Sequence, residues 1–331
     1  MKILVRLPNW LGDMVMSVGF MHQLPHFFPG AEVSVIAKKG IHELLPFFPP
    51  VKHAFIFSKE EYKGPRGLIR FGKMIRKTER FDLFFCLPDS FSSAIMGAAT
   101  GARKRVGYKN EFRQMLFTNS YRKEEYLHRA RGYIQLLEDY TKKKPVTVDV
   151  SLQHHFPKKD YIVVNINSEA SSRRLTLEKA VEIISWLRRQ VEEKIILIGA
   201  PKEKEFVDTV FSQLPNQSEI ENAAGKTSLA ALVELLASAR VMLSTDSGPA
   251  HLANALSTYT VVLFGAGRED HTAPFKKECR SIIRLGKLSC EPCEKNVCVR
   301  YGVPQCLERL DSNRIIDTIK LQLPDDRKKF F

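Results

Sequence analysis

Short apolar runs alternate with longer amphipathic segments along most of this chain. Such runs are typical of strands buried in a parallel sheet, and the segments between them repeat apolar residues at the spacing of one helix face. Strands are predicted at 3–6, 32–37, 53–57, 81–87, 105–107, 161–165, 194–198, 239–244 and 260–264. Helices are predicted at 14–24, 40–45, 63–77, 92–99, 177–190, 203–214 and 229–237, and another begins near Gly248. The alternation predicts an α/β fold with two doubly wound parallel sheets.

Residues 141–160 interrupt this alternation with lysines and two prolines, Pro145 and Pro157. A change of composition of this kind is typical of a linker. We therefore expect an N-terminal domain at 1–155 and a C-terminal domain at 156–331, each large enough to bury its own core. The last helix is expected on the C-terminal domain or packed back on the N-terminal one. Ligands of doubly wound sheets bind at the carboxyl ends of the strands, so we expect the site between the domains.

The segment 244–256 joins a predicted strand to a predicted helix. Three residues of types that cap helices come first: Thr245, Asp246 and Ser247. Gly248 stands at the junction, Pro249 suits the first helical turn, and the N–H groups of such a helix start bind phosphate. A capped helix without a ligand explains the same pattern. Asp246 and His251 favour a binding site, because both carry polar groups that capping does not require.

Two other predicted strands also end in polar loops. The loop after the first strand places Asp13 at the start of a helix, where its carboxylate caps N–H groups or serves as a general base. After the strand 161–165, residues 167–174 offer small hydroxyl side chains and two adjacent guanidinium groups, Arg173 and Arg174. These groups suit phosphate oxygens, and a solvated loop is the alternative.

The net charge of +14 is concentrated in the first half of the chain. Residues 1–155 hold 25 lysines and arginines against 14 aspartates and glutamates, whereas the remainder holds 26 against 23. This imbalance favours an anionic partner: nucleic acid, an acidic membrane surface or a phosphorylated substrate. The predicted helix 63–77 is the most basic part, with one face formed by Arg66, Arg70, Lys73 and Lys77. Such a helix lies on anionic lipid, or it is an ordinary surface helix with its apolar side in the core.

The six cysteines are expected to be thiols or metal ligands. No apolar run approaches the ~18 residues that cross a bilayer, and the chain begins with a predicted strand instead of a signal peptide, so we expect a cytoplasmic protein. Four cysteines have a spacing that suits a structural zinc ion: Cys290, Cys293, Cys298 and Cys306. Free thiols in a packed loop are the alternative, and Cys86 is expected in the core.

Several common motifs are absent. Gly225–Thr227 resembles the end of a P-loop, but Ile220 stands where the leading glycine is required. Gly265–Gly267 lacks the third glycine of a dinucleotide fingerprint, and the chain contains neither Gly-x-Ser-x-Gly nor Asp-x-Asp. Any diphosphate is therefore expected to be neutralised by cations and helix ends, without carboxylate-held Mg²⁺.

Taken together, these residues resemble a known family, the ADP-heptose:lipopolysaccharide heptosyltransferases of glycosyltransferase family 9, and most closely their heptosyltransferase II branch. The most specific match is Thr245-Asp-Ser-Gly-x-x-His251, at the expected spacing from Trp10-Leu-Gly-Asp13. The resemblance covers most of the chain through Trp10–Ser17, Leu87–Ser93, Arg105–Tyr108, Ala224–Leu229, Thr245–His251 and Leu263–Gly265. Two departures stand out: the loop 167–174 is one residue shorter than is usual, and arginine replaces the common lysine.

The resemblance implies a GT-B fold, in which two facing Rossmann-like domains bind the sugar donor on the C-terminal side and the lipid acceptor on the N-terminal side. Family members move heptose from ADP-heptose to the inner core of lipopolysaccharide with inversion and without a catalytic metal, and Asp13 occupies the position of their base. The implied donor-binding residues are Ser168, Arg173 or Arg174, Thr245, Asp246, Ser247, Gly248, His251, and Glu203 or Glu205 at the ribose. The implied acceptor-binding residues are Asn9, Trp10, Arg66, Arg70 and Lys73.

An acceptor built on lipid A with Kdo and heptose would lie at the inner face of the inner membrane, so peripheral membrane binding is expected. Three alternatives stay open. One is a sugar-nucleotide enzyme of related fold that is not a transferase, such as an epimerase, and another is a family member that uses a different nucleotide sugar. A nucleic-acid-binding protein ranks last, because the basic helix lacks interleaved stacking aromatics apart from Phe71.

Overall fold

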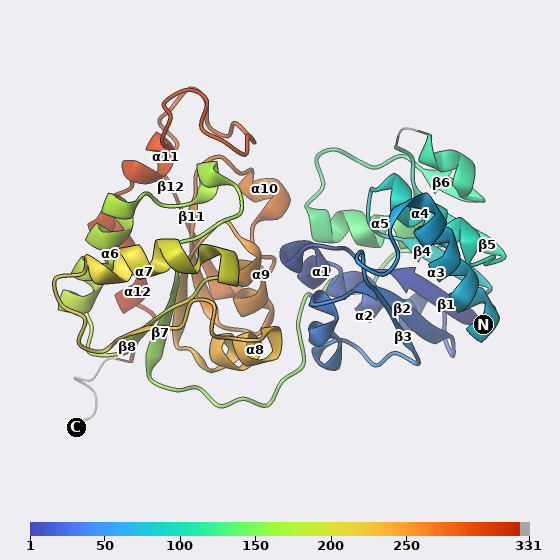
Figure 1. Ribbon diagram of the computed structural model, residues 1–331, viewed down its shortest axis with the longest axis horizontal. Helices are drawn as coiled ribbons and strands as arrows, with labels where there is room; N and C mark the ends of the chain where they lie inside the picture. Colours follow the sequence, from blue (N-terminus) through green and yellow to red (C-terminus); the bar gives the residue numbers. More distant parts are fainter. Residues whose placement is uncertain (111, 325–331) are drawn as a thin grey trace. The chain divides into compact units, whose positions relative to one another are not determined.

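A computed structural model describes residues 1–110 and 112–324 of the 331-residue chain. These residues form two compact units, Met1–Gln153 and a second that begins at His154 (Figure 1). The sequence places the boundary between 155 and 156, inside the irregular stretch 142–160. The predicted C-terminal domain runs to Phe331, and its residues 325–331 lie outside the described part.

The N-terminal unit is built on a six-stranded sheet in the order β3-β2-β1-β4-β5-β6, with every neighbouring pair parallel. Its strands are β1 (Lys2–Arg6), β2 (Glu32–Lys38), β3 (Ala54–Phe57), β4 (Leu83–Cys86), β5 (Lys104–Tyr108) and β6 (Asn119–Tyr121). Its α-helices are α1 (Leu11–Met16), α2 (Val18–Phe27), α3 (Gly64–Thr78), α4 (Phe91–Ala99) and α5 (Arg129–Thr141).

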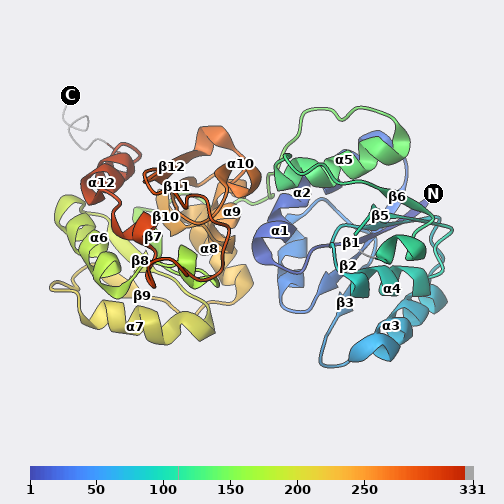
Figure 2. The same cartoon turned by 90° about the horizontal axis from the view of Figure 1, so that it is seen from above.

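Helices cover both faces of this sheet, as Figure 2 shows. Successive side chains of a strand point to opposite faces, so neighbouring phenylalanines of β4 serve two different cores. Phe84 packs against α4, where its ring leaves no room for a side chain at Gly97. Phe85 points the other way, and its ring centroid lies 5.3 Å from that of Phe20 on α2. This double burial explains why the strands are almost continuously apolar.

The C-terminal unit repeats the plan with a parallel sheet in the order β12-β11-β10-β7-β8-β9. Its strands are β7 (Tyr161–Asn165), β8 (Lys194–Leu197), β9 (Ile220–Asn222), β10 (Val241–Thr245), β11 (Tyr259–Phe264) and β12 (Arg280–Arg284). Its α-helices are α6 (Leu177–Gln190), α7 (Lys204–Ser212), α8 (Leu229–Ser238), α9 (Gly248–Ala255), α10 (Glu269–Thr272), α11 (Gln305–Glu308) and α12 (Ser312–Lys320).

The structure corrects several predicted elements. The helix expected at 14–24 is two helices that meet at Ser17, whose hydroxyl donates to the Met14 carbonyl. The segment at 41–47 is a 3₁₀ helix, and α5 was not predicted at all. The last described helix, α12, belongs to the C-terminal unit, because Ile315, Ile316 and Ile319 lie in its core. None of the described helices is both long and apolar enough to cross a membrane.

Candidate active site

Both sheets have the same topological switch point, which fixes where a ligand would bind. In each unit the chain order runs outward in both directions from one central pair, β1 with β4 and β7 with β10. In open parallel sheets the crevice at the carboxyl ends of such a pair is the usual ligand site. Asp13 follows β1, residues 167–174 follow β7 and Asp246 follows β10. The topology therefore brings these predicted groups to the two switch points.

Asp13 lies in the first turn of α1 and is paired with a cation on α5. Its Oδ1 is 2.7 Å from Nη1 of Arg129, and its side chain is only 15% exposed. Burial alone lowers the pKa of Arg129, but the carboxylate of Asp13 more than offsets this effect, so the pKa lies above its ordinary value. The pairing orients the carboxylate, because a guanidinium donates along fixed directions.

Tyr133 stands beside this pair, one turn along α5. It is buried, and burial, followed by the charge of Asp13, raises the pKa of its phenol well above the ordinary value. The phenol is therefore neutral at physiological pH and retains a proton that it can donate. Asp13 thus sits in an environment built from α1 and α5, two helices that also pack against each other.

Arg6, the last residue of β1, stabilises the loop between β1 and α1 and is 1% exposed. Its guanidinium donates to the carbonyls of Leu7 and Ile36 at 2.7 and 3.2 Å and to Oδ1 of Asn9. Burial lowers the pKa of Arg6 to about 10, which still leaves it charged at neutral pH. Asn9 is therefore partly committed to a structural contact, whereas Trp10 is 59% exposed with Nζ of Lys38 5.9 Å from its ring centroid.

The basic helix α3 has the two faces that its sequence predicts. Leu68, Phe71 and Ile75 are buried, and the basic face of Arg66, Arg70, Lys73 and Lys77 is exposed. Arg70 also donates to the Glu61 carbonyl at 2.7 Å and stacks on Tyr62. The apolar side packs on α4 so closely that no side chain fits at Gly72, where Ala99 and the Met96 carbonyl occupy the space.

In the C-terminal unit, a buried asparagine joins the two central loops. The Nδ2 group of Asn165, the last residue of β7, donates to Oγ of Ser244 at 3.2 Å and of Ser247 at 2.8 Å. Thr245 Oγ1 donates back to the Asn167 carbonyl at 2.5 Å, and Ser168 Oγ donates to the Asp246 carbonyl at 3.3 Å. The loops after β7 and β10 therefore form one hydrogen-bonded unit, in which Ser168, Thr245 and Ser247 have structural partners.

The two adjacent arginines of this region have different partners. Nη1 of Arg173 lies 3.1 Å from Oδ2 of Asp246, whose side chain is 5% exposed. Arg174 instead lies over the ring of Phe206, 5.0 Å from its centroid. The Arg173 side chain keeps 27% exposure, so at this ion pair the cation is the more accessible group. Of the two, Arg173 is the one at the switch point.

The start of α9 differs from the predicted cap. Ser247 occupies the N-cap position, but among the described residues its side chain accepts no hydrogen bond from the helix N–H groups. Its hydroxyl turns back to the Thr245 carbonyl at 3.2 Å. Gly248 begins the helix, Pro249 lies in its first turn, and His251 is buried. Phosphate binding at this helix start stays a prediction.

The two glutamates predicted to bind the ribose, Glu203 and Glu205, have different surroundings. Glu203 accepts a hydrogen bond from the Ala200 N–H at 2.7 Å, so it stabilises the turn that precedes α7. Glu205 lies in the first turn of α7 and is exposed. No contact of the structure assigns a ribose to either one, and the choice between them stays a prediction.

The structure does not gather the four predicted zinc ligands. Within residues 1–110 and 112–324, no group of three or more His, Cys, Asp or Glu side chains is arranged to hold a metal ion. Cys306 is buried on α11 against Gly265, and burial raises the pKa of its thiol to about 11. Cys290, Cys293 and Cys298 are only partly buried in the irregular segment before α11. Cys86 is buried in β4, as predicted.

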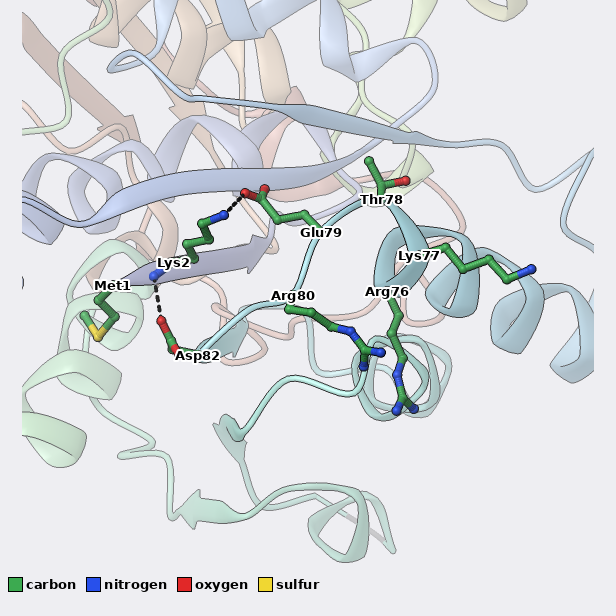
Figure 3. Close-up of a pocket in the computed structure, with 8 residues that line it drawn as sticks. All are labelled: Met1, Lys2, Arg76, Lys77, Thr78, Glu79, Arg80 and Asp82. Carbon is green, nitrogen blue, oxygen red and sulfur yellow. Dashed lines mark hydrogen bonds and ion pairs between the residues drawn. The ribbon is translucent and has the colours of Figure 1, made fainter.

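A surface pocket of the N-terminal unit lies at the opposite end of its sheet. It is lined by Met1, Lys2, Arg76, Lys77, Thr78, Glu79, Arg80 and Asp82 (Figure 3). Lys2 contacts both acidic residues of this lining. The Lys2 Nζ lies 2.7 Å from Oε1 of Glu79, and the Lys2 backbone N–H donates to Oδ2 of Asp82 at 2.9 Å. The pocket is at the start of β1, away from the switch point, and has no residue of the candidate site.

Sequence reasoning missed four residues that shape the two switch points: Arg129, Tyr133, Asn165 and Asn167. The first two belong to α5, whose apolar spacing at Ala130, Tyr133, Ile134 and Leu137 and whose capping His128 are visible signals. Asn165 ends an otherwise apolar strand, and a polar residue in that place is also a signal. Apart from the bond between Asn165 and the Asn167 carbonyl, the partners of these residues come from distant parts of the chain.

Comparison with known proteins agrees with this geometry. The model of the family described as glycosyltransferase family 9 (heptosyltransferase) matches residues 68–303. Lipooligosaccharide heptosyltransferase 2 of Haemophilus ducreyi is 29% identical over 315 residues, covering 86% of this chain and 89% of that protein. Lipopolysaccharide heptosyltransferase 2 of Escherichia coli is 27% identical over 310 residues, covering 86% and 88%.

A solved structure has the same fold over almost all of this chain. The structure of Escherichia coli ADP-heptose LPS heptosyltransferase II matches with a TM-score of 0.82 at 24% identity, and it covers 97% of this chain and 98% of that one. Two parallel six-stranded sheets, each flanked by helices, are thus the GT-B architecture. Because the family model matches well over half of its residues, this chain belongs to glycosyltransferase family 9, the heptosyltransferases.

Proposed function

We propose that this protein transfers heptose from ADP-heptose to the inner core of lipopolysaccharide, with inversion at the anomeric carbon. Relatives named as heptosyltransferase 2 of lipopolysaccharide or lipooligosaccharide support the substrate class. The observation that carries the proposal is the convergence of two distant loops at the β7/β10 switch point, where Arg173 meets Asp246 beside the start of α9. A partly exposed guanidinium beside a helix start offers the donors that bind the phosphates of a nucleoside diphosphate.

Asp13 is the proposed general base. Inverting transfer needs one group that removes the proton from the acceptor hydroxyl as that oxygen attacks the anomeric carbon. The ion pair with Arg129 holds the carboxylate in one orientation, and the neutral phenol of Tyr133 lies close to it. A positioned base contributes roughly a hundred- to ten-thousandfold to the rate.

Arg173 and the start of α9 are the proposed stabilisers of the leaving ADP. Negative charge develops on the diphosphate as the glycosidic bond breaks, and fixed donors aimed at that charge lower the barrier. Asp246 holds Arg173 in place, and the other proposed donor-binding residues of this region are Ser168, Thr245, Ser247, Gly248 and His251. Arg174 contributes at most indirectly, because it stacks on Phe206. In this proposal one of Glu203 and Glu205 binds the ribose, and no metal takes part in the chemistry.

The N-terminal unit is the proposed acceptor side. Asn9 and Trp10 lie in the loop between β1 and α1, just before Asp13, and the exposed tryptophan ring offers a surface on which a sugar can stack. The basic face of α3, which includes Arg66, Arg70 and Lys73, is proposed to contact the phosphates and carboxylates of the lipid-linked acceptor or the anionic membrane around it. The enzyme would then work at the inner face of the inner membrane.

Asp13→Asn tests the assignment of the base. We expect kcat to fall by roughly a hundred- to ten-thousandfold, because an amide cannot accept the proton, while ADP binding and the melting temperature stay unchanged. The assay follows ADP release and heptose addition to a lipid A acceptor that bears Kdo and heptose. Asp82→Asn is the matched control, since this carboxylate lies at the opposite end of the sheet and pairs with Lys2. Wild-type rates in Asp13→Asn would refute the role of Asp13.

The same assay separates the rival functions. An epimerase would convert ADP-heptose without acceptor, whereas a transferase leaves the donor sugar unchanged until acceptor is added. A relative that uses another nucleotide sugar would show tighter binding of that compound in a thermal-shift panel. Structural zinc at Cys290, Cys293, Cys298 and Cys306 also stays a proposal, and the metal content of protein purified without added zinc tests it.

A further inference from the structure

The segment that carries three of the cysteines touches the loop after β7, which belongs to the proposed donor site, and the turn after β11, which lies against Asp246. This segment, called the strap from here on, comprises residues 285–304 between β12 and α11 and contains no helix or strand. It forms the long orange-red loop between β12 and α11 in Figure 1. Irregular segments of this length are uncommon in compact domains and are usually functional.

The first set of contacts ties the strap to the loop after β7. The Ser172 N–H donates to the Asn296 carbonyl at 3.2 Å, and Ser172 Oγ donates to the Lys295 carbonyl at 2.5 Å. The Ser171 hydroxyl adds a weaker bond to the Asn296 carbonyl at 3.3 Å. Ser172 is 2% exposed, so its two hydrogen bonds are shielded from water. Ser172 directly precedes Arg173, so these hydrogen bonds also restrict the backbone position of Arg173.

The second contact ties the strap to the turn after β11. The Glu294 N–H donates to the Ala266 carbonyl at 2.8 Å. One residue further, Gly267 lies against Oδ2 of Asp246 so closely that no side chain fits there. The strap thus contacts the residue before Arg173 in the loop after β7. It also contacts the turn after β11, which packs against the carboxylate of Asp246.

We propose that the strap is a positioning element for the donor diphosphate, with Ser172 as its principal anchor. This inference rests on the proposed function, because it assumes that Arg173 binds the diphosphate of ADP. Residues 294–296 fix the 171–172 backbone and the 266–267 turn at the same time, so Arg173 and Asp246 keep one relative geometry before the donor arrives. Pre-ordering of this kind improves affinity, since the ligand does not have to order the loop itself.

Ser172→Ala tests the anchor. Loss of one shielded neutral hydrogen bond corresponds to about a fivefold change in an equilibrium constant. We therefore expect the Kd for ADP and the KM for the nucleotide sugar to rise about fivefold, with the KM for the acceptor unchanged. Ser171→Ala, which removes the longer and more exposed bond, should fold in any case and raise the ADP Kd by a smaller factor in the same direction.

Ser93→Ala is the matched control, because Ser93 is another serine with 2% exposure and hydrogen-bonds to Ser90 in the N-terminal unit. It should lower the melting temperature comparably and leave the ADP Kd unchanged. Arg173→Ala distinguishes failure of the proposed donor site from failure of the proposed role of the strap. If it binds ADP like the wild type, the donor site itself is wrong. If it weakens ADP while both serine variants keep the wild-type Kd, the donor site stands and the strap has no positioning role.

Discussion

At the scale of single residues, the ion-pair partner of each charged group distinguishes it from similar residues nearby. Asp13 is distinguished from an ordinary first-turn aspartate by Arg129, and Arg173 is distinguished from Arg174 by Asp246. In each pair the arginine stays partly exposed to water, which limits the contribution of the pair to stability. The value of these pairs therefore lies in orientation, which catalysis needs more than folding does.

Arg129→Met should separate orientation from stability. Removing the guanidinium leaves Asp13 without its fixed partner, so we expect kcat to fall roughly ten- to a hundredfold while the melting temperature changes little. Steady-state kinetics and thermal unfolding measure the two effects. Arg131→Met is the control, because Arg131 lies on the same helix but contacts Glu138 at 3.4 Å. Equal losses in both variants would mean that Arg129 supports α5 and has no special relation to Asp13.

At the scale of elements, close packing decides where small residues are required. Gly72 of α3 faces α4, where an added Cβ would meet the Ala99 side chain and the Met96 carbonyl. Gly132 of α5 has only the Lys123 side chain near it, at 3.8 Å from such an atom. The two glycines are both helical, but only the first is a packing requirement.

Gly72→Ala and Gly132→Ala should therefore have opposite effects on stability. The first forces the two helices apart and should lower the free energy of unfolding by about 1–3 kcal/mol. The second restricts the unfolded chain without a clash and should raise it by about 0.4–1 kcal/mol. Urea unfolding monitored by circular dichroism measures both. A stable Gly72→Ala protein would show that the contact between α3 and α4 is looser than the structure has it.

At the scale of the whole molecule, the charge is unevenly shared between two units of the same topology. The N-terminal unit holds most of the excess of basic residues, and α3 displays four of them on a face that buries no core residue. Attraction to an anionic leaflet is worth about 1 kcal/mol for each basic residue near its surface. We therefore propose that the basic face of α3 binds an anionic membrane surface reversibly.

Changing Arg66, Arg70, Lys73 and Lys77 together to glutamine should weaken binding to anionic liposomes by roughly a hundredfold or more at low salt. Liposome co-sedimentation measures this, and glutamine keeps the helix propensity. A control removes the same charge from the other unit through glutamine at Lys159, Lys194, Arg314 and Lys320. If the two variants bind liposomes equally, net charge alone governs binding and α3 has no specific role.

The sequence by itself determined the class of fold, most element positions and the family, because these depend on local patterns. Buried strands are apolar whichever strands they pair with, and α6 was predicted at its observed bounds, 177–190. The motif around Asp246 and the place of Asp13 are likewise contiguous in the chain. Helix α5 was the main element missed, although its apolar spacing is present in the sequence.

Only the tertiary structure decided which side chains act together. Arg129 is 116 residues from Asp13, Asp246 is 73 residues from Arg173, and the strap meets Ser172 across more than 120 residues. No local pattern encodes such pairs, because they arise from the packing of α5 against α1 and from the strand order that places β10 beside β7. The chemistry of this protein therefore depends on parallel strands that end at the same edge of a sheet, where loops distant in sequence become neighbours.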